Sequence, residues 1–225
     1  MNFTETSSWV SRIIKDKANY DIIHSDQKTS IHTDQYITDN GYLVTVQLRS
    51  TGRSLDTISA QKRIDDEFGR YHASVLRRQC FQSNKINRRH KRLQPLAFIA
   101  FDIEGSRHNG FSFTTRHPHG HGVMLFHERT LADFKVANAK FQTLEGGFKI
   151  INPTPAISLI DLKPIGSATD LSKWLRYSLK LERNLQNSTT SYAPYNFYPH
   201  ASVDFPFWGW RPDTLNGSPT SLAAS

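Results

Sequence analysis

Alternating or continuous runs of β-branched, aromatic and aliphatic residues predict four β-strands in this chain. The first predicted strand follows Asp39-Asn40-Gly41, a sequence typical of a turn. The second and third are separated by a polar, glycine-flanked turn at 105–110. The predicted strands are residues 42–48, 96–104, about 111–126 and 156–162.

Apolar residues at helical spacing predict three helices between and after these strands. The first begins at a Ser54 cap and runs to about residue 76, and the second runs from Glu128 to about residue 144. The third begins at Thr169 or Asp170 and continues through Leu181. The resulting order is β, α, β, β, α, β, α. It predicts an α+β fold with a βαββαβ(α) core, in which helices pack on one face of a mostly antiparallel sheet.

The flanking segments differ in composition from this core, so the chain divides into segments 1–40, 41–186 and 187–225. Residues 1–40 are polar with scattered apolar anchors, and we expect an arm with one short helix and one strand. From about residue 187 the chain is rich in Ser, Thr, Pro and aromatic residues, and its last ten residues are expected to be disordered. We favour a tail that folds back over exposed core, with base stacking or docking on a partner as the alternative.

The charge balance favours a polyanionic partner, because 28 Lys and Arg residues oppose 20 Asp and Glu residues and the pI is about 9.6. Cys80 is the only cysteine, which excludes an internal disulfide and a Cys-based zinc site and fits a reducing compartment. Neither a signal peptide nor an apolar run of membrane-spanning length is found, so we expect a soluble intracellular protein with no membrane partner.

The segment His117-Pro118-His119-Gly120-His121 carries the sharpest chemical signal. On a strand, His119 and His121 project from the same face, so both imidazoles can reach one divalent ion. Val123 and Leu125 continue that face into the core. Two histidines leave such a site incomplete, and a carboxylate would complete it.

The strand before this segment offers that carboxylate. One of its faces is apolar, and the other carries Phe98, Ala100, Asp102 and Glu104. We favour Glu104 as the third ligand because it lies just before the turn, with Asp102 one pleat deeper as a reserve. His117 is a second reserve, since it shares the parity of the histidine pair. This ranking predicts that Glu104→Ala weakens metal binding more than His117→Ala.

A second signal lies on the last predicted helix, where Tyr177 and Lys180 are three residues apart and share a face. A phenol is almost entirely protonated at neutral pH, and a nearby ammonium would favour the phenolate. Tyr177 is therefore a candidate nucleophile, whereas an ordinary amphipathic helix with Tyr at the core edge is the alternative.

A basic run precedes the second strand and is our candidate for binding a duplex or hairpin backbone, although a solvated charged loop is the alternative. Its cationic candidates are Lys85, Arg88, Arg89, Lys91 and Arg92. The spacing Gly105 to Gly110 is followed by Phe111, so no phosphate-binding loop of the Walker type is present. The chain thus lacks the sequence signature of a nucleotide-driven motor.

Together, these motifs resemble the HUH endonucleases, a family of rolling-circle replication initiators, conjugative relaxases and transposases. The resemblance covers about residues 42–182. His119-Gly120-His121 is similar to the family's metal-binding histidine pair, with Gly120 where a bulky apolar residue is usual. Tyr177-Ser178-Leu179-Lys180 is similar to the Tyr-x-x-Lys motif of single-tyrosine replication initiators, and 42–48 resembles the apolar strand beside the site.

The resemblance implies a ferredoxin/RRM-like HUH nuclease fold and metal-dependent transesterification with Mg²⁺ or Mn²⁺. Tyr177 would become linked to a 5′ phosphate of single-stranded origin DNA, in some cases presented on a stem-loop. A separate helicase would open the duplex. The implied setting is the cytoplasm of a bacterium that carries a plasmid or phage. A relaxase or transposase with the same chemistry, or a non-catalytic metal-stabilised nucleic-acid-binding module, remains the alternative.

Overall fold

We analysed a computed structural model of the chain, which describes residues 3–25, 31–50, 52–82, 92–102, 114–181 and 194–199. Its principal strands are β1 (Gly41–Leu48), β3 (Leu96–Asp102), β5 (His119–Leu125), β6 (Phe148–Ile151), β7 (Ile157–Pro164) and β8 (Tyr195–Tyr198). The longer helices are α1 (Phe3–Ile23), α2 (Thr33–Asn40), α3 (Thr57–Arg70), α6 (Glu128–Ala137) and α7 (Ala168–Ser178). Shorter elements are β2 (Leu55–Asp56), the π-helical turn Tyr71–Leu76, α4 (Arg77–Phe81), β4 (Thr114–Thr115) and the 3-10 turn Ala139–Phe141.

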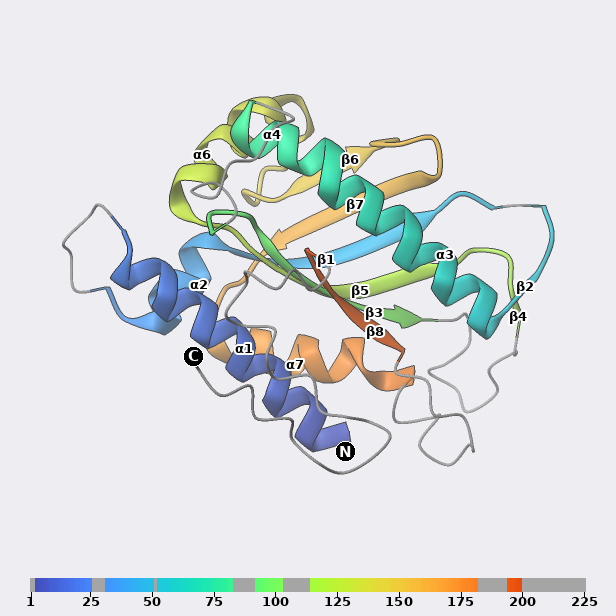
Figure 1. Cartoon of the computed structure of the whole chain (residues 1–225), viewed down its shortest axis with the longest axis horizontal. Helices are drawn as coiled ribbons and strands as arrows, with labels where there is room; N and C mark the ends of the chain where they lie inside the picture. Colours follow the sequence, from blue (N-terminus) through green and yellow to red (C-terminus); the bar gives the residue numbers. More distant parts are fainter. Residues whose placement is uncertain are drawn as a thin grey trace, which may run out of the picture.

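The six principal strands form one sheet in the order β6-β7-β1-β5-β3-β8, and every neighbouring pair is antiparallel (Figure 1). The predicted α+β class and antiparallel sheet are therefore confirmed. This architecture places β5 between β1 and β3, so a side chain on β5 can meet partners from both neighbours.

Helices cover both faces of the sheet, whereas the sequence predicted helices on one face. On one side, α3 and α6 pack over Val44, Ile99 and Met124, and on the other α1 and α7 pack over Phe98 and Val123 (Figure 1). The physical reason lies in β3, where all seven residues are buried and both parities are apolar. A strand that is apolar on both faces needs a covering layer on each.

The first forty residues supply much of that second layer. Instead of the expected short helix and strand, the described part of this segment forms α1 and α2. Trp9, Val10, Ile13 and Ile14 recur at helical spacing along α1 and are buried against the sheet and α7. Their polar neighbours dilute the apolar signal in the sequence, which explains the wrong prediction. None of the described helices is long and apolar enough to cross a membrane.

Part of the C-terminal segment folds back, as favoured from the sequence. Strand β8 pairs antiparallel with β3, and Phe197 packs against Trp9 and Phe98 with ring centroids 5.4 and 5.1 Å apart. This covers the edge of β3, which would otherwise expose unpaired backbone groups. The last ten residues lie outside the described part of the chain.

Several element boundaries differ from the prediction. Helix α3 begins at Thr57 rather than near Ser54, because the Asp56 carboxylate accepts a hydrogen bond from the Ser59 amide at 2.9 Å and acts as the cap. Helix α7 begins at Ala168 with Ser167 as its cap. Strand β6 was not predicted, and α6 ends at Ala137.

Gly122 on β5 marks a close approach between strands and gives a test of the fold. A Cβ atom there would lie 1.7 Å from the Phe98 carbonyl oxygen of β3. We expect Gly122→Ala to lower the free energy of unfolding by about 3 kcal/mol or more, because backbone must shift to relieve the clash. Urea denaturation followed by circular dichroism measures this. Gly166→Ala, whose nearest contact would be the Asp170 carboxylate at 3.0 Å, is the milder comparison.

Candidate metal centre

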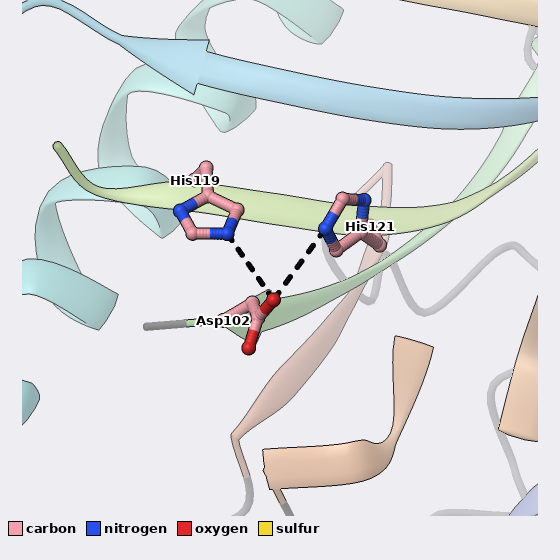
Figure 2. Close-up of side chains that lie close together, drawn as sticks. All are labelled: Asp102, His119 and His121. Atoms are coloured by element: carbon pink, nitrogen blue, oxygen red, sulfur yellow. Dashed lines mark hydrogen bonds and ion pairs between the residues drawn. The ribbon is translucent and has the colours of Figure 1, made fainter. Parts of the chain in front are cut away.

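The candidate site lies where β5 and β3 run side by side, on the face covered by α7. His119 and His121 project from β5 towards the Asp102 carboxylate at the end of β3 (Figure 2). The antiparallel register pairs Asp102 directly with His119 and Ala100 with His121. The same-face prediction for the two histidines is therefore confirmed, and Val123 and Leu125 continue that face into the core.

Three ligand atoms converge in this cluster. Asp102 Oδ2 is 3.1 Å from His119 Nε2 and 3.5 Å from His121 Nε2 (Figure 2). Two ligands that each lie about 2.1 Å from an ion, at right angles to each other, are about 3 Å apart. The separations thus fit one divalent cation held by two imidazoles and a carboxylate. Such a mixed nitrogen and oxygen donor set does not by itself fix the identity of the metal.

The other ring nitrogens of both histidines have partners that orient them. His119 Nδ1 donates a hydrogen bond to the His117 carbonyl oxygen 3.1 Å away, so Nε2 is the ring nitrogen that faces Asp102, and an ion would take the place of its hydrogen bond to that carboxylate. His121 Nδ1 is 3.1 Å from the hydroxyl oxygen of Thr45, directly across from it on β1. Both Nε2 atoms therefore face Asp102 before any ion arrives.

Thr45 gives a test of this orientation. Thr45→Val keeps the shape of the side chain but removes the hydroxyl that holds His121 Nδ1. We expect Mn²⁺ affinity to fall about tenfold, the lower end of the range for such supporting contacts, with little change in the unfolding temperature. Titration calorimetry measures the affinity. Thr38→Val on the exposed part of α2 is a matched control, and equal affinities in the two variants would contradict the proposed role.

The pKa shifts in the cluster favour metal binding by Asp102 and His121. Burial alone would raise the pKa of Asp102, but hydrogen bonds with His119, His121 and Lys180 outweigh it and hold that pKa far below its usual range. Burial lowers the pKa of His121 and outweighs the contact with Asp102, which acts to raise it. Burial also acts to lower the pKa of His119, but its closer contact with Asp102 outweighs this and raises that pKa. Asp102 is thus anionic and His121 neutral, the forms that bind metal.

Helix α7, which ends at Ser178 rather than continuing through Leu181, brings the predicted Tyr177 to the same cluster, and Lys180 follows just beyond its end. The Tyr177 ring lies 4.9 Å from the His121 ring, measured between centroids, and its side chain is half-buried. Lys180 Nζ is 2.5 Å from Asp102 Oδ2 and 4.3 Å from the centroid of the Tyr177 ring. The helix and the histidine strand, more than 50 positions apart in sequence, therefore meet at one point.

Trp174 fixes the position of α7 over the site. Its indole Nε1 donates a hydrogen bond to the Gly122 carbonyl oxygen at 2.7 Å, and its ring lies 5.2 Å from Tyr177 and 5.6 Å from His121. The sequence did not single out Trp174 or Thr45. Trp174 lies one helical turn before Tyr177, which is the signal that could have found it. No sequence signal marks Thr45, because its contact with His121 depends on the register between β1 and β5.

Of the two carboxylates proposed as the third ligand, the structure places the reserve candidate, Asp102, beside the histidines. Asp102 was ranked lower because it lies one pleat deeper than Glu104, but the register places it directly opposite His119. Glu104 lies outside the described residues. His117 is exposed and is not part of the cluster that the described residues form; only its carbonyl oxygen contacts His119.

The remaining predicted residues lie away from this centre or outside the described chain. Of the basic candidates, Lys85, Arg88, Arg89 and Lys91 lie outside the described residues, and Arg92 is exposed.

Gly120, between the two histidines, faces away from the cluster, and a Cβ there would meet Ile99 Cγ2 at 2.8 Å. Ile99 and Ile64 thus fill the space that a bulky residue would occupy.

Comparison of the chain with models of known protein families, with curated proteins and with solved structures found no match. The geometry defines an α+β protein with a six-stranded antiparallel sheet and an Asp/His/His cluster that could hold a metal ion.

Proposed function

We propose that this protein is a rolling-circle replication initiator that nicks and rejoins single-stranded origin DNA through Tyr177. The observation that carries the proposal is the 4.9 Å contact between the rings of Tyr177 and His121. It brings a candidate nucleophile, a candidate metal centre and the Lys180 ammonium together, which are the parts that covalent phosphoryl transfer requires.

In the proposed reaction, Tyr177 Oη attacks the phosphorus of the scissile phosphodiester. The Oη–P bond forms, the P–O3′ bond breaks, and the phenolic proton ends on the oxygen of the released 3′ hydroxyl. A bound Mg²⁺ or Mn²⁺ would supply charge stabilisation at the non-bridging oxygens. In the reverse step a 3′ hydroxyl attacks the phosphotyrosine and regenerates the phenol, so resealing needs no ATP.

The protein's own residues prepare this step. Trp174 and His121 contact the Tyr177 ring and limit the orientations of its hydroxyl. Lys180 lies between the Asp102 carboxylate and the Tyr177 ring, so its ammonium can favour the developing phenolate. His119, His121 and Asp102 are the residues that would hold the ion. Preorganisation of this kind lowers the barrier because little has to move during the reaction.

The wider role rests on the resemblance to single-tyrosine initiators. The substrate would be unpaired DNA at an origin, presented on a stem-loop or opened by a separate helicase, because a base-paired strand cannot thread into a small site. The released 3′ hydroxyl would prime synthesis in the cytoplasm of a plasmid- or phage-carrying cell. A net charge of +8 supports a polyanionic partner.

Two rival functions make different demands on the site. A relaxase typically presents three histidines, but His117 is exposed and lies outside the cluster, which favours an initiator. A non-catalytic metal-stabilised module would place Tyr177 in the core or far from the histidines. The half-buried Tyr177 beside His121 argues against that function.

The test is incubation of the full chain with Mn²⁺ and single-stranded oligonucleotides of candidate origin sequence. We expect a protein–DNA adduct that survives denaturing electrophoresis and a second product with a free 3′ hydroxyl. Chelation by EDTA and pairing with the complementary strand should each suppress the adduct. Cleavage without any covalent adduct would contradict the tyrosine mechanism.

A further inference from the structure

A second concave site lies at the other end of β5 from the histidine cluster. This pocket, of about 470 Å³, is bounded by the last turn of α1, the start of α6 and the segment that leads into β3. His127 at its wall is six residues beyond His121, a separation of about 20 Å along an extended chain. Its volume is within the range of sites for small ligands.

The charge of the pocket suits an anion. Arg92 and Arg129 line it, and both are exposed. Its acidic lining residue is Asp21, whose carboxylate is almost fully buried and forms an ion pair with the buried Lys17 ammonium. The charge of Asp21 is therefore balanced from within the protein. The two arginines leave the lining with a net positive charge when its histidines are neutral.

The Glu128 carboxylate, next to the pocket residues His127 and Arg129, is also hydrogen-bonded within the protein. The Glu128 carboxylate, at the first position of α6, accepts a hydrogen bond from the Ser25 hydroxyl at 2.6 Å. Helix α6 begins beside the pocket with His127 as its cap, so the positive end of the helix dipole adds to the field of the arginines. A planar guanidinium matches two oxygens of a phosphate, which makes arginine a suitable ligand for that group.

The aromatic lining narrows the class of anion. Tyr20 and His24 stack on each other, with ring centroids 4.1 Å apart and planes inclined by 26°, and both line the pocket. Stacked flat rings beside a phosphate site are suited to a nucleobase, because every base has a π-face that can stack. Arg92 also ends the basic run that begins at Lys85 in the sequence.

We propose that this pocket binds the phosphate of a nucleotide unit, with Arg92 and Arg129 on the phosphate and Tyr20 or His24 against the base. The unit is either a free mononucleotide or part of a nucleic-acid strand. The site is separate from the histidine cluster, and its existence does not depend on the nicking activity proposed above.

The test measures binding of adenosine 5′-monophosphate and of a fluorescent oligothymidylate to the full chain, with the Arg92→Gln/Arg129→Gln double variant. We expect the double variant to bind at least one of these probes tenfold or more weakly. The matched control is Lys149→Gln/Lys163→Gln, which removes the same charge from exposed positions on β6 and β7 and should change affinity less than about twofold.

The two sources of the phosphate give different results. If only oligothymidylate binding is lost, the natural ligand is a strand. The slope of log affinity against log salt concentration should then become shallower by roughly 0.7 to 0.9 for each phosphate contact removed. Loss of mononucleotide binding identifies a free nucleotide. Equal weakening in the double variant and its control, or no weakening in either, would overturn the proposal. Adduct formation by the double variant at saturating oligonucleotide, and retained pocket binding by Tyr177→Phe, separate this proposal from the nicking activity.

Discussion

Tyr177→Phe is expected to reduce covalent adduct formation and strand cleavage by at least about a thousandfold, since removal of a nucleophile abolishes the covalent step. The substitution deletes one oxygen atom and keeps the ring that contacts His121 and Trp174. Affinity for single-stranded DNA should therefore change less than about twofold. Denaturing electrophoresis measures the adduct, and fluorescence anisotropy measures DNA binding.

Tyr42→Phe is the matched control for this variant. It deletes the hydroxyl of a tyrosine that packs against Phe126, on the face of the sheet away from the metal cluster. We expect normal adduct formation, apart from any loss of stability. Undiminished cleavage by Tyr177→Phe would show that another group is the nucleophile, whereas equal losses in both variants would point to a general effect on folding.

The sequence could predict the parts of the fold that depend on local pattern. Strand alternation identified β1, β3, β5 and β7, and the two-residue side-chain period placed His119 and His121 on one face. The spacing also brought Tyr177 and Lys180 together, and the Lys180 ammonium lies 4.3 Å from the centroid of the Tyr177 ring, although α7 ends at Ser178. These predictions succeed because they depend on periods of 2 and 3.6 residues, which are properties of the backbone.

Register and layering could not be predicted in the same way. Asp102 and Glu104 share a parity, and only the pairing of β3 with β5 decides which carboxylate lies opposite His119. The contact between Thr45 and His121 depends on a second pairing, between β1 and β5. Whether α1 packs on the sheet depends on long-range burial, which leaves only a diluted periodic signal in a polar segment.

The supporting contacts of the site are therefore tertiary features. Trp174 reaches the Gly122 carbonyl across the interface between α7 and β5, and Lys180 reaches Asp102 on β3. Neither contact follows from the motif in which the residue lies. A motif identifies candidate chemistry, and the fold decides which candidates meet.

Asp102→Asn is expected to weaken Mn²⁺ binding about a hundredfold, more than any other single change that leaves both histidines in place. The substitution keeps the size of the side chain but removes its charge, and an amide oxygen is a weaker ligand than a carboxylate for a hard ion. His119→Ala and His121→Ala should each have an effect of similar size. His117→Ala should change affinity less than about twofold, because its backbone carbonyl rather than its ring contacts His119.

Lys180→Met distinguishes metal coordination by the Asp102 carboxylate from its ion pair with Lys180. Asp102→Asn also removes the ion pair with Lys180, so its effect on metal binding could in principle arise through that lysine. Lys180→Met breaks the same ion pair while leaving the carboxylate charged, and it removes a cation that competes for Oδ2. Mn²⁺ affinity should therefore be unchanged or higher in Lys180→Met, although cleavage should fall. Titration calorimetry on folded protein measures the Mn²⁺ affinity of each variant, and unfolding temperatures are measured in parallel. Mn²⁺ affinity that falls equally in Asp102→Asn and Lys180→Met would mean that the ion pair, and not coordination by the carboxylate, supports the site.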